Sequence, residues 1–274
     1  MKIAVGFSGQ PRFYKETFPI FKKLIFDRYE TDIYCHSWWS EEEVKKGMSL
    51  SWSSSISEFA LDPDFPNQFE SLYKPKKFLI EKSLLLKEEN LRDNFYKRVK
   101  ELYPQYNINY LQYPDSESFI HKFISTERLS NIVNWEENYD WFFLCRFDCV
   151  PSKIPDLNKL EKQKLYSFID DFGTFSKEST IVNEFPNQVF YNDGGYFFDP
   201  GLKDILNTRK FLFDYMAENK NVYTLTPEFI KSLHLKYLNW NDKLVSLPSE
   251  EFNMLIVRNM NEIKIQYEKN SISC

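Results

Sequence analysis

The chain has no excess of positive charge, few cysteines and no long hydrophobic run. Its 35 lysines and arginines are outnumbered by 40 aspartates and glutamates, so it lacks the positive field with which proteins attract nucleic acid. Four cysteines are too few for a disulfide framework in 274 residues, and we expect reduced thiols. No apolar run reaches the roughly 18 residues of a membrane span, and residues 1–7 lack a signal-peptide core. We expect a soluble, cytoplasmic protein that does not bind nucleic acid and has no transmembrane segment.

What the chain does have is enough apolar sequence for a buried core. Hydrophobic residues make up 42% and charged residues 27%, a balance typical of globular enzymes and binding domains. The length of 274 residues exceeds the commonest domain size, yet α/β domains of roughly 250 residues often form one unit. The sequence therefore predicts a single domain over residues 1–274.

The N-terminal segment reads strand, turn, helix, strand. Residues 3–7 form a short apolar run, which the polar residues 8–12 interrupt. A second strand is predicted over residues 32–36. Between the two predicted strands, apolar residues recur at helical spacing: Tyr14, Phe18, Phe21 and Ile25. This order predicts a parallel βαβ unit.

The rest of the chain continues this pattern. Residues 141–145 are continuously apolar, as expected for a central parallel strand that is covered on both faces. The polar stretch 40–67 predicts a long loop or lid, and the tail after Asn259 has no strong pattern. Further strands are predicted over residues 78–80, 165–169 and 189–191, and helices over residues 88–102, 117–135, 202–216 and 227–238. The predicted fold class is α/β, with a mostly parallel central sheet flanked by helices.

Arg12 follows the first predicted strand, at the edge where open α/β sheets bind ligands. We place it at the start of a helix, where backbone amides and the helix dipole favour anions, and Gly9 would let the backbone approach a ligand. Arg12 is therefore a candidate contact for a diphosphate. The alternative is an ordinary turn over residues 8–10 with a solvated arginine.

Arg146 and Asp148 directly follow the central strand, at the edge of a dry core. Unpaired charge is costly there, so both side chains need partners. In one interpretation they form a structural ion pair. In the other, Asp148 coordinates a divalent cation and Arg146 meets phosphate, and together they neutralise charge on a departing nucleotide.

Three short motifs follow one another along the chain. Residues 8–13 read SGQPRF, residues 32–38 read DIYCHSW, and Tyr139-Asp140-Trp141 leads to Arg146-Phe147-Asp148. In these motifs the chain resembles a family of bacterial and viral GT-A glycosyltransferases that act on cell-surface or capsid polysaccharides. The resemblance implies a Rossmann-like GT-A sheet, with a nucleotide-sugar-binding half over about residues 1–150 and a smaller acceptor half over about residues 151–274. It also implies a UDP- or GDP-sugar donor, a glycan or other hydroxyl acceptor, and a role in polysaccharide biosynthesis.

The family usually holds Mn²⁺ or Mg²⁺ through an Asp-x-Asp motif, for which this chain has Arg146-Phe147-Asp148. Either Asp148 is the metal ligand, together with water and phosphate oxygens, or Arg146 takes over part of the work of the ion. His36 could reach the nucleotide, and Trp38 could stack on a base or a sugar. The predicted donor-binding residues are Ser8, Gly9, Gln10, Arg12, His36, Trp38, Arg146 and Asp148.

Asp193 is the predicted catalytic residue. An inverting transfer needs a carboxylate to take the proton of the acceptor hydroxyl, and the resemblance places the acceptor region in this part of the chain. The surrounding sequence, residues 192–195, is also typical of a tight hairpin turn.

The sequence thus predicts a glycosyltransferase, a hexosyl- or pentosyltransferase assisted by a divalent metal. Two alternatives stay open. One is a non-catalytic domain that binds a nucleotide or carbohydrate, in which the incomplete metal motif reflects lost activity. The other is a sugar nucleotidyltransferase, although residues 8–12 contain only one of the glycines that its phosphate loop would need.

Overall fold

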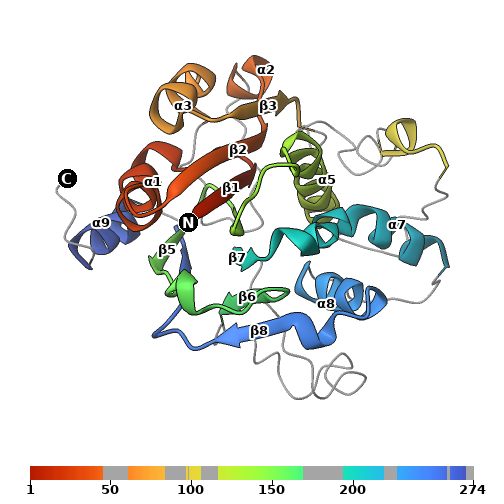
Figure 1. Cartoon of the computed structure of the whole chain (residues 1–274). Coiled ribbons are helices and arrows are strands. Elements are labelled where there is room, and N and C mark those ends of the chain that lie inside the picture. Colours follow the sequence, from red (N-terminus) through yellow and green to blue (C-terminus); the bar gives the residue numbers. More distant parts are fainter. Residues whose placement is uncertain are drawn as a thin grey trace.

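A seven-stranded sheet forms the centre of the computed structural model (Figure 1). The structure describes residues 1–45, 61–83, 97, 99–105, 117–168, 194–218, 227–257 and 260–269. The strands of this part of the chain are β1 (Lys2–Gly9), β2 (Glu30–Trp38), β3 (Lys77–Glu81), β4 (Trp141–Cys145), β5 (Cys149–Lys153), β6 (Leu165–Phe168), β7 (Gly195–Phe198), β8 (Leu244–Leu247) and β9 (Asn253–Ile256). Its α-helices include α1 (Tyr14–Phe21), α2 (Glu41–Lys45), α3 (Phe65–Tyr73), α5 (Glu117–Ile132), α7 (Thr208–Glu218), α8 (Pro227–Tyr237) and α9 (Met260–Lys269).

The strands of the large sheet follow the order β3-β2-β1-β4-β7-β6-β8. Every neighbouring pair is parallel except the two that involve β7, which runs antiparallel to both β4 and β6. The predicted α/β class with a mostly parallel sheet is confirmed. The C-terminal part of the chain adds β6, β7 and β8 to the same sheet, and the division into a donor half and an acceptor half stays a prediction.

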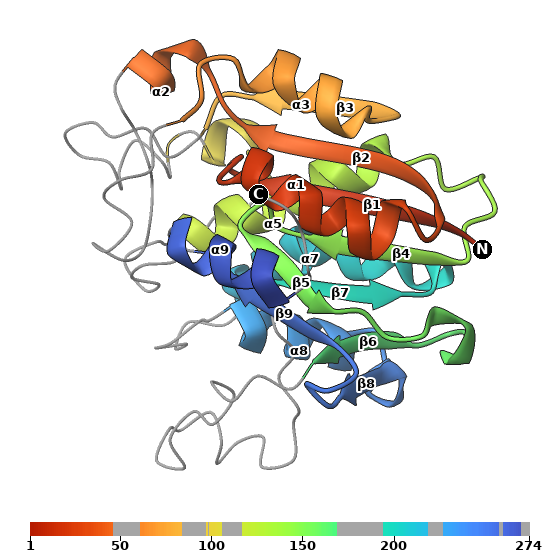
Figure 2. The same ribbon diagram turned by 90° about the vertical axis from the view of Figure 1, so that its left-hand side faces the viewer.

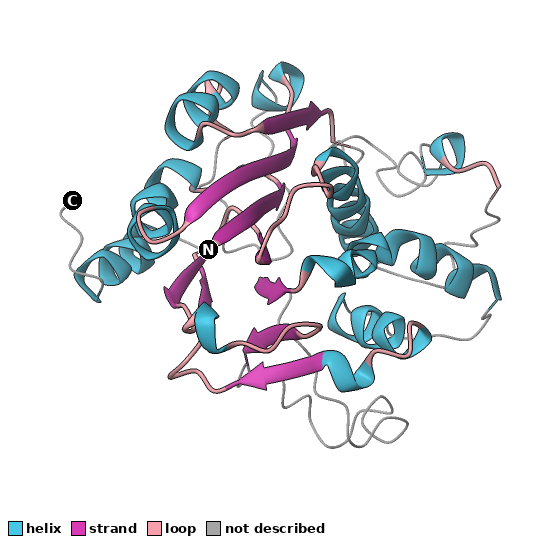
Figure 3. Cartoon of the chain, viewed as in Figure 1, coloured by secondary structure: helices cyan, strands magenta, loops and turns pink. Residues whose placement is uncertain are grey.

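Helices cover both faces of the sheet (Figures 1 and 3). On one face Ile3, Val5 and Phe7 of β1 pack in a core that includes residues of α1, α3, α9 and the small β5-β9 sheet; α1 and α9 lie in front of the strands in Figure 2. On the other face Ala4 packs with residues of α5 and α8. Because both faces are covered, all five residues of β4 are buried.

Several helices differ from their predictions. The stripe that reaches Ile25 ends in a π-helical segment, Lys22–Phe26, which follows Pro19 by a few residues. The helix predicted over residues 202–216 consists of a 3₁₀ helix, Pro200–Asn207, followed by α7. The other predicted helices and strands in the described part of the chain agree to within a few residues. Residues 84–96 and 189–191 lie outside the described residues.

The tail after Asn259, where the sequence shows no strong pattern, is helical. It forms α9, which packs on α1: Ile263 is buried, and Tyr267 Oη donates to the Glu16 carbonyl at 2.6 Å. The spacing of these two apolar residues is helical, but the exposed Ile265 between them gives residues 263–267 the alternation of a strand and weakens the pattern. The short strands β5, β8 and β9 were not predicted either.

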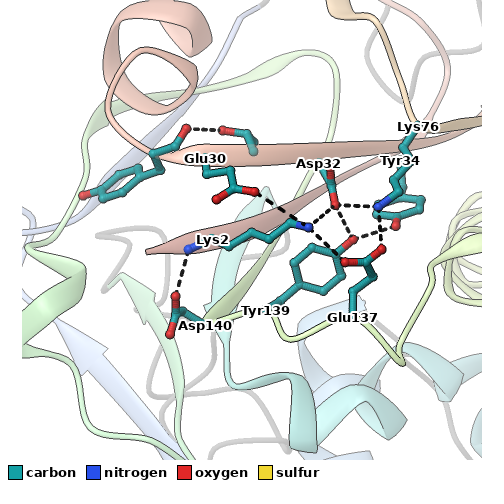
Figure 4. A network of polar contacts seen from close by, with 10 residues as sticks. Lys2, Glu30, Asp32, Tyr34, Lys76, Glu137, Tyr139 and Asp140 are labelled. Carbon is teal, nitrogen blue, oxygen red and sulfur yellow. Dashed lines mark hydrogen bonds and ion pairs between the residues drawn. The ribbon is translucent and has the colours of Figure 1, made fainter.

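An ion network, formed by Lys2, Asp32, Lys76 and Glu137, joins the N-terminal ends of the parallel strands (Figure 4). The two ammonium groups lie 3.1 and 2.9 Å from Asp32 Oδ2, and 2.9 and 2.8 Å from the carboxylate of Glu137. Tyr139 Oη also donates to Asp32, at 2.7 Å.

Among the described residues, no helix is long and apolar enough to cross a membrane.

Candidate functional site

The polar residues that follow β1 and β4 converge at the C-terminal ends of these strands, at the edge of the sheet opposite the ion network. β1 and β4 are parallel neighbours, with Phe7 level with Cys145. The chain therefore leaves both strands at the same edge, which carries Arg12 from the first and Arg146 and Asp148 from the second. This is the edge at which open α/β sheets bind ligands.

Arg12, Arg146 and Asp148 form an arginine–aspartate cluster. Arg146 Nε and Nη2 donate to the two oxygens of Asp148 at 2.8 and 2.7 Å, a bidentate pair. Arg12 Nη1 lies 3.7 Å from Asp148 Oδ2. Only 4% of Asp148 and 8% of Arg12 is exposed, whereas the side chain of Arg146 is 28% exposed. The structure thus brings together three of the predicted donor-binding residues, and it contains the ion pair of the first interpretation.

The turn between β1 and α1 brings Arg12 into the cluster. Gly9 has a φ of 112°, which side chains disfavour, and a Cβ there would meet no atom within 4 Å. The Arg12 amide then donates to the Gln10 carbonyl at 2.8 Å, and Arg12 Nη2 donates to Gln10 Oε1 at 2.6 Å. Arg12 lies just before α1 rather than in its first turn, since the cap residue is Phe13.

Among the described residues, two cations and one anion give the cluster an excess of positive charge. Burial lowers the pKa of the Arg12 guanidinium, and the Asp148 carboxylate opposes this shift. The group remains charged, because an arginine pKa lies far above neutrality. Its Nε is buried and has no hydrogen-bond acceptor. A partly desolvated arginine with a spare donor, beside a second arginine, suits an anion.

No protein-family model and no curated protein matches the chain. Solved structures do match, and glycosyltransferases are among them. GlyE of Streptococcus pneumoniae TIGR4 is 12% identical with a TM-score of 0.40, over 89% of this chain and 44% of GlyE. An active-site mutant of LgtC is 9% identical with a TM-score of 0.42, over 91% of this chain and 73% of LgtC. The galactosyltransferase LgtC with donor and acceptor sugar analogues is also 9% identical, with a TM-score of 0.39, over 100% and 84%. The chain spans less than half the length of GlyE.

The described residues around Asp148 do not fit a divalent metal. Both carboxylate oxygens accept hydrogen bonds from Arg146, and two guanidinium groups would repel a cation. Within the described ranges, no three His, Cys, Asp or Glu side chains are grouped to hold an ion. The predicted Mn²⁺ or Mg²⁺ site at Asp148 stays a prediction that this donor set does not support.

His36 and Trp38 lie in the interior, on the face of the sheet covered by α5. The His36 ring is fully buried: Nε2 lies 2.8 Å from Glu81 Oε2 and Nδ1 lies 2.7 Å from Ser125 Oγ. Because an ionised carboxylate only accepts, Nε2 carries the proton and Nδ1 accepts from the serine. Burial lowers the pKa of His36, against the opposing effect of Glu81, which favours this neutral ring.

Trp38 is 2% exposed and stacks on His121, with ring centroids 4.2 Å apart. These contacts give His36 and Trp38 structural roles, and their predicted contact with a nucleotide stays a prediction. Ser8, the last residue but one of β1, is also buried, and the carbonyl of Gly9, which ends the strand, accepts from Ser37 Oγ at 3.2 Å. The predicted catalytic Asp193 lies outside the described residues.

Two acidic residues beside the ends of β2 and β3 were not singled out from the sequence. Glu81 ends β3 and contacts both His36 and Arg128, whose Nε lies 3.3 Å from Glu81 Oε2. The rule that finds polar residues at strand ends could have found it. Glu43 of α2 is fully buried, and no local pattern marks it, because it lies in a run of three glutamates.

Proposed function

We propose that this chain is a glycosyltransferase that moves a sugar from a nucleotide-sugar donor to a hydroxyl acceptor such as a glycan. The proposal rests on the arginine–aspartate cluster at the ligand-binding edge of the sheet. The motifs that resemble GT-A glycosyltransferases contain all three of its residues. GlyE and LgtC are also glycosyltransferases, but the argument rests on the cluster.

In this proposal the two arginines bind the diphosphate of the donor. Negative charge grows on the leaving nucleoside diphosphate as the sugar departs, and guanidinium groups that are already in position stabilise that charge. Asp148 holds Arg146 through two hydrogen bonds, which fixes the plane of its guanidinium. Asp193 is the proposed base for the acceptor hydroxyl. The donor is a UDP- or GDP-sugar in this scheme, and the product belongs to polysaccharide biosynthesis.

The test is to incubate the protein with UDP-, GDP-, CMP- and dTDP-sugars and to measure both thermal unfolding and release of the nucleotide. A nucleotide at about a hundred times its Kd should add roughly 2.7 kcal/mol to the free energy of unfolding. We expect one base to stabilise the protein and its sugar nucleotide to be hydrolysed slowly without an acceptor. The variant Arg12→Ala should lose most of the stabilisation.

Arg28→Ala is the matched control. Arg28 is exposed and lies just before β2, near the N-terminal ends of the parallel strands and thus at the opposite end of the sheet from the cluster. It should behave as the unchanged protein does. Stabilisation without any turnover would indicate a binding domain instead. If no nucleotide stabilises the protein, the proposal is wrong.

A further inference from the structure

We propose that the arginine–aspartate cluster replaces a divalent cation in neutralising the charge of the donor diphosphate, so that the diphosphate is bound and released at this site without metal. This inference rests on the proposed function. It assigns Asp148 a positioning role, through Arg146, in place of the predicted role of metal ligand.

The first argument concerns the oxygens of Asp148. A carboxylate coordinates a metal ion through its lone pairs, and here each oxygen accepts a short hydrogen bond from Arg146, at 2.8 and 2.7 Å. The carboxylate is 4% exposed, so its surroundings leave little water to complete a coordination shell. A metal at Asp148 would have to displace Arg146 and leave that cation without its carboxylate partner.

The second argument concerns charge. Arg12 Nη1 lies 3.7 Å from Asp148 Oδ2, on a side chain that is itself more than nine-tenths buried. Like charges repel strongly where water is scarce, so two arginines around one carboxylate oppose a further dication. The same excess of positive charge attracts a diphosphate, and Arg12 Nε is a buried donor with no acceptor.

The third argument concerns the reaction. The bond between the anomeric carbon and the β-phosphate oxygen breaks, and its electron pair leaves with the nucleoside diphosphate. The acceptor oxygen forms the new bond to that carbon and gives its proton to a base. Only the leaving diphosphate gains negative charge, and two guanidinium groups can stabilise that charge by donating several N–H hydrogen bonds to the phosphate oxygens. The step therefore balances without a metal ion.

The experiment measures UDP and GDP binding to the whole chain, by calorimetry, in EDTA and in Mn²⁺. We expect equal affinity under the two conditions for the nucleotide that binds. Arg12→Ala and Arg146→Ala should each weaken binding roughly tenfold or more in EDTA, while the control Arg28→Ala should bind normally. Binding that requires Mn²⁺ would overturn this inference and leave the proposed function standing. If neither nucleotide binds under either condition, both this inference and the proposed function are wrong.

A double-mutant cycle tests the positioning role of Asp148. If Asp148 acts through Arg146, Asp148→Asn should weaken binding in EDTA, yet have little further effect once Arg146 is alanine. Ethylguanidinium added at millimolar concentration should partly restore binding to Arg146→Ala, in which the Asp148 carboxylate remains to hold it. It should not restore binding once Asp148 is asparagine as well. If Asp148→Asn instead leaves binding in EDTA unchanged and abolishes only a gain caused by Mn²⁺, Asp148 is a metal ligand and the inference is wrong.

Discussion

Glu43 shows at the scale of a single residue how burial sets the behaviour of a charge. Its Oε2 accepts from Ser40 Oγ at 2.8 Å and from the Ser83 amide at 3.4 Å, whereas Oε1 is buried with no partner. Burial raises the pKa of this carboxyl above its usual value, against the opposing hydrogen bonds. An ionised Glu43 therefore costs stability in the folded protein.

We predict that Glu43→Gln stabilises the protein near neutral pH and much less in acid. The folded state binds the Glu43 proton more tightly than the unfolded chain, so stability falls as pH rises from the ordinary carboxyl pKa to the raised one. Glutamine removes that loss and keeps an acceptor for Ser40 and Ser83. Urea unfolding at about pH 7 and about pH 4 checks the prediction. An equal effect at the two pH values would contradict it, and Glu41→Gln, at an exposed position of the same helix, is the control.

At the scale of elements, a glycine in β1 sets how closely α5 approaches the sheet. A Cβ built on Gly6 would lie 2.6 Å from Phe142 Cζ and 2.7 Å from Leu129 Cδ2, closer than real contacts allow. Phe142 belongs to β4 and Leu129 to α5, and both are fully buried. The helix thus packs into the space that the missing side chain leaves.

We predict that Gly6→Ala destabilises the protein by about 1–3 kcal/mol, because two buried side chains must shift to admit one methyl group. The matched control is Gly201→Ala, where the nearest atoms belong to the polar side chains of Gln163 and Asp199, at 3.0 and 3.1 Å. Gly201 is exposed, so those side chains can move, and the loss should be smaller. Chemical denaturation of the two variants measures the difference. Equal losses would show that the packing at Gly6 tolerates a methyl group.

At the scale of the whole molecule, the two ends of the parallel strands carry different kinds of charge. The N-terminal ends are joined by the ion network of Lys2, Asp32, Lys76 and Glu137, in which acids and bases are matched (Figure 4). The other edge carries the arginine–aspartate cluster, in which cations exceed anions. Matched charges hold the strand ends together, whereas the excess of cations over anions in the described part of the cluster favours binding of an anion.

We predict that Asp32→Asn lowers the melting temperature by a few degrees near neutral pH without changing nucleotide binding. Burial opposes ionisation of Asp32, but hydrogen bonds from Lys76, Tyr139 and Lys2 outweigh it and lower the pKa of the carboxyl. Its contribution is therefore present above the ordinary carboxyl pKa and is lost as pH falls through the lowered one. Thermal scans across this range, and at raised salt, check the prediction. A variant as stable as the original at neutral pH would show that the network adds nothing.

The sequence by itself determined where the main strands lie and which residues leave them at the ligand-binding edge. Residues 3–7 and 141–145 are strands because their apolar runs are local and strong, and residues 32–36 contain a shorter run between Asp32 and His36. Parallel pairing then brings Arg12 to the same edge as Arg146 and Asp148, since the connecting helix must return the chain to the start of the next strand.

Only the tertiary structure decided how those charges are paired. That Arg12 lies against the pair of Arg146 and Asp148, and that His36 is enclosed by Glu81 and Ser125, depends on side chains from distant segments. The sheet of β5 and β9 and the packing of α9 on α1 were missed for the same reason. Local periodicity reports the burial of an element, but contacts across a hundred residues are fixed by packing that no short pattern encodes.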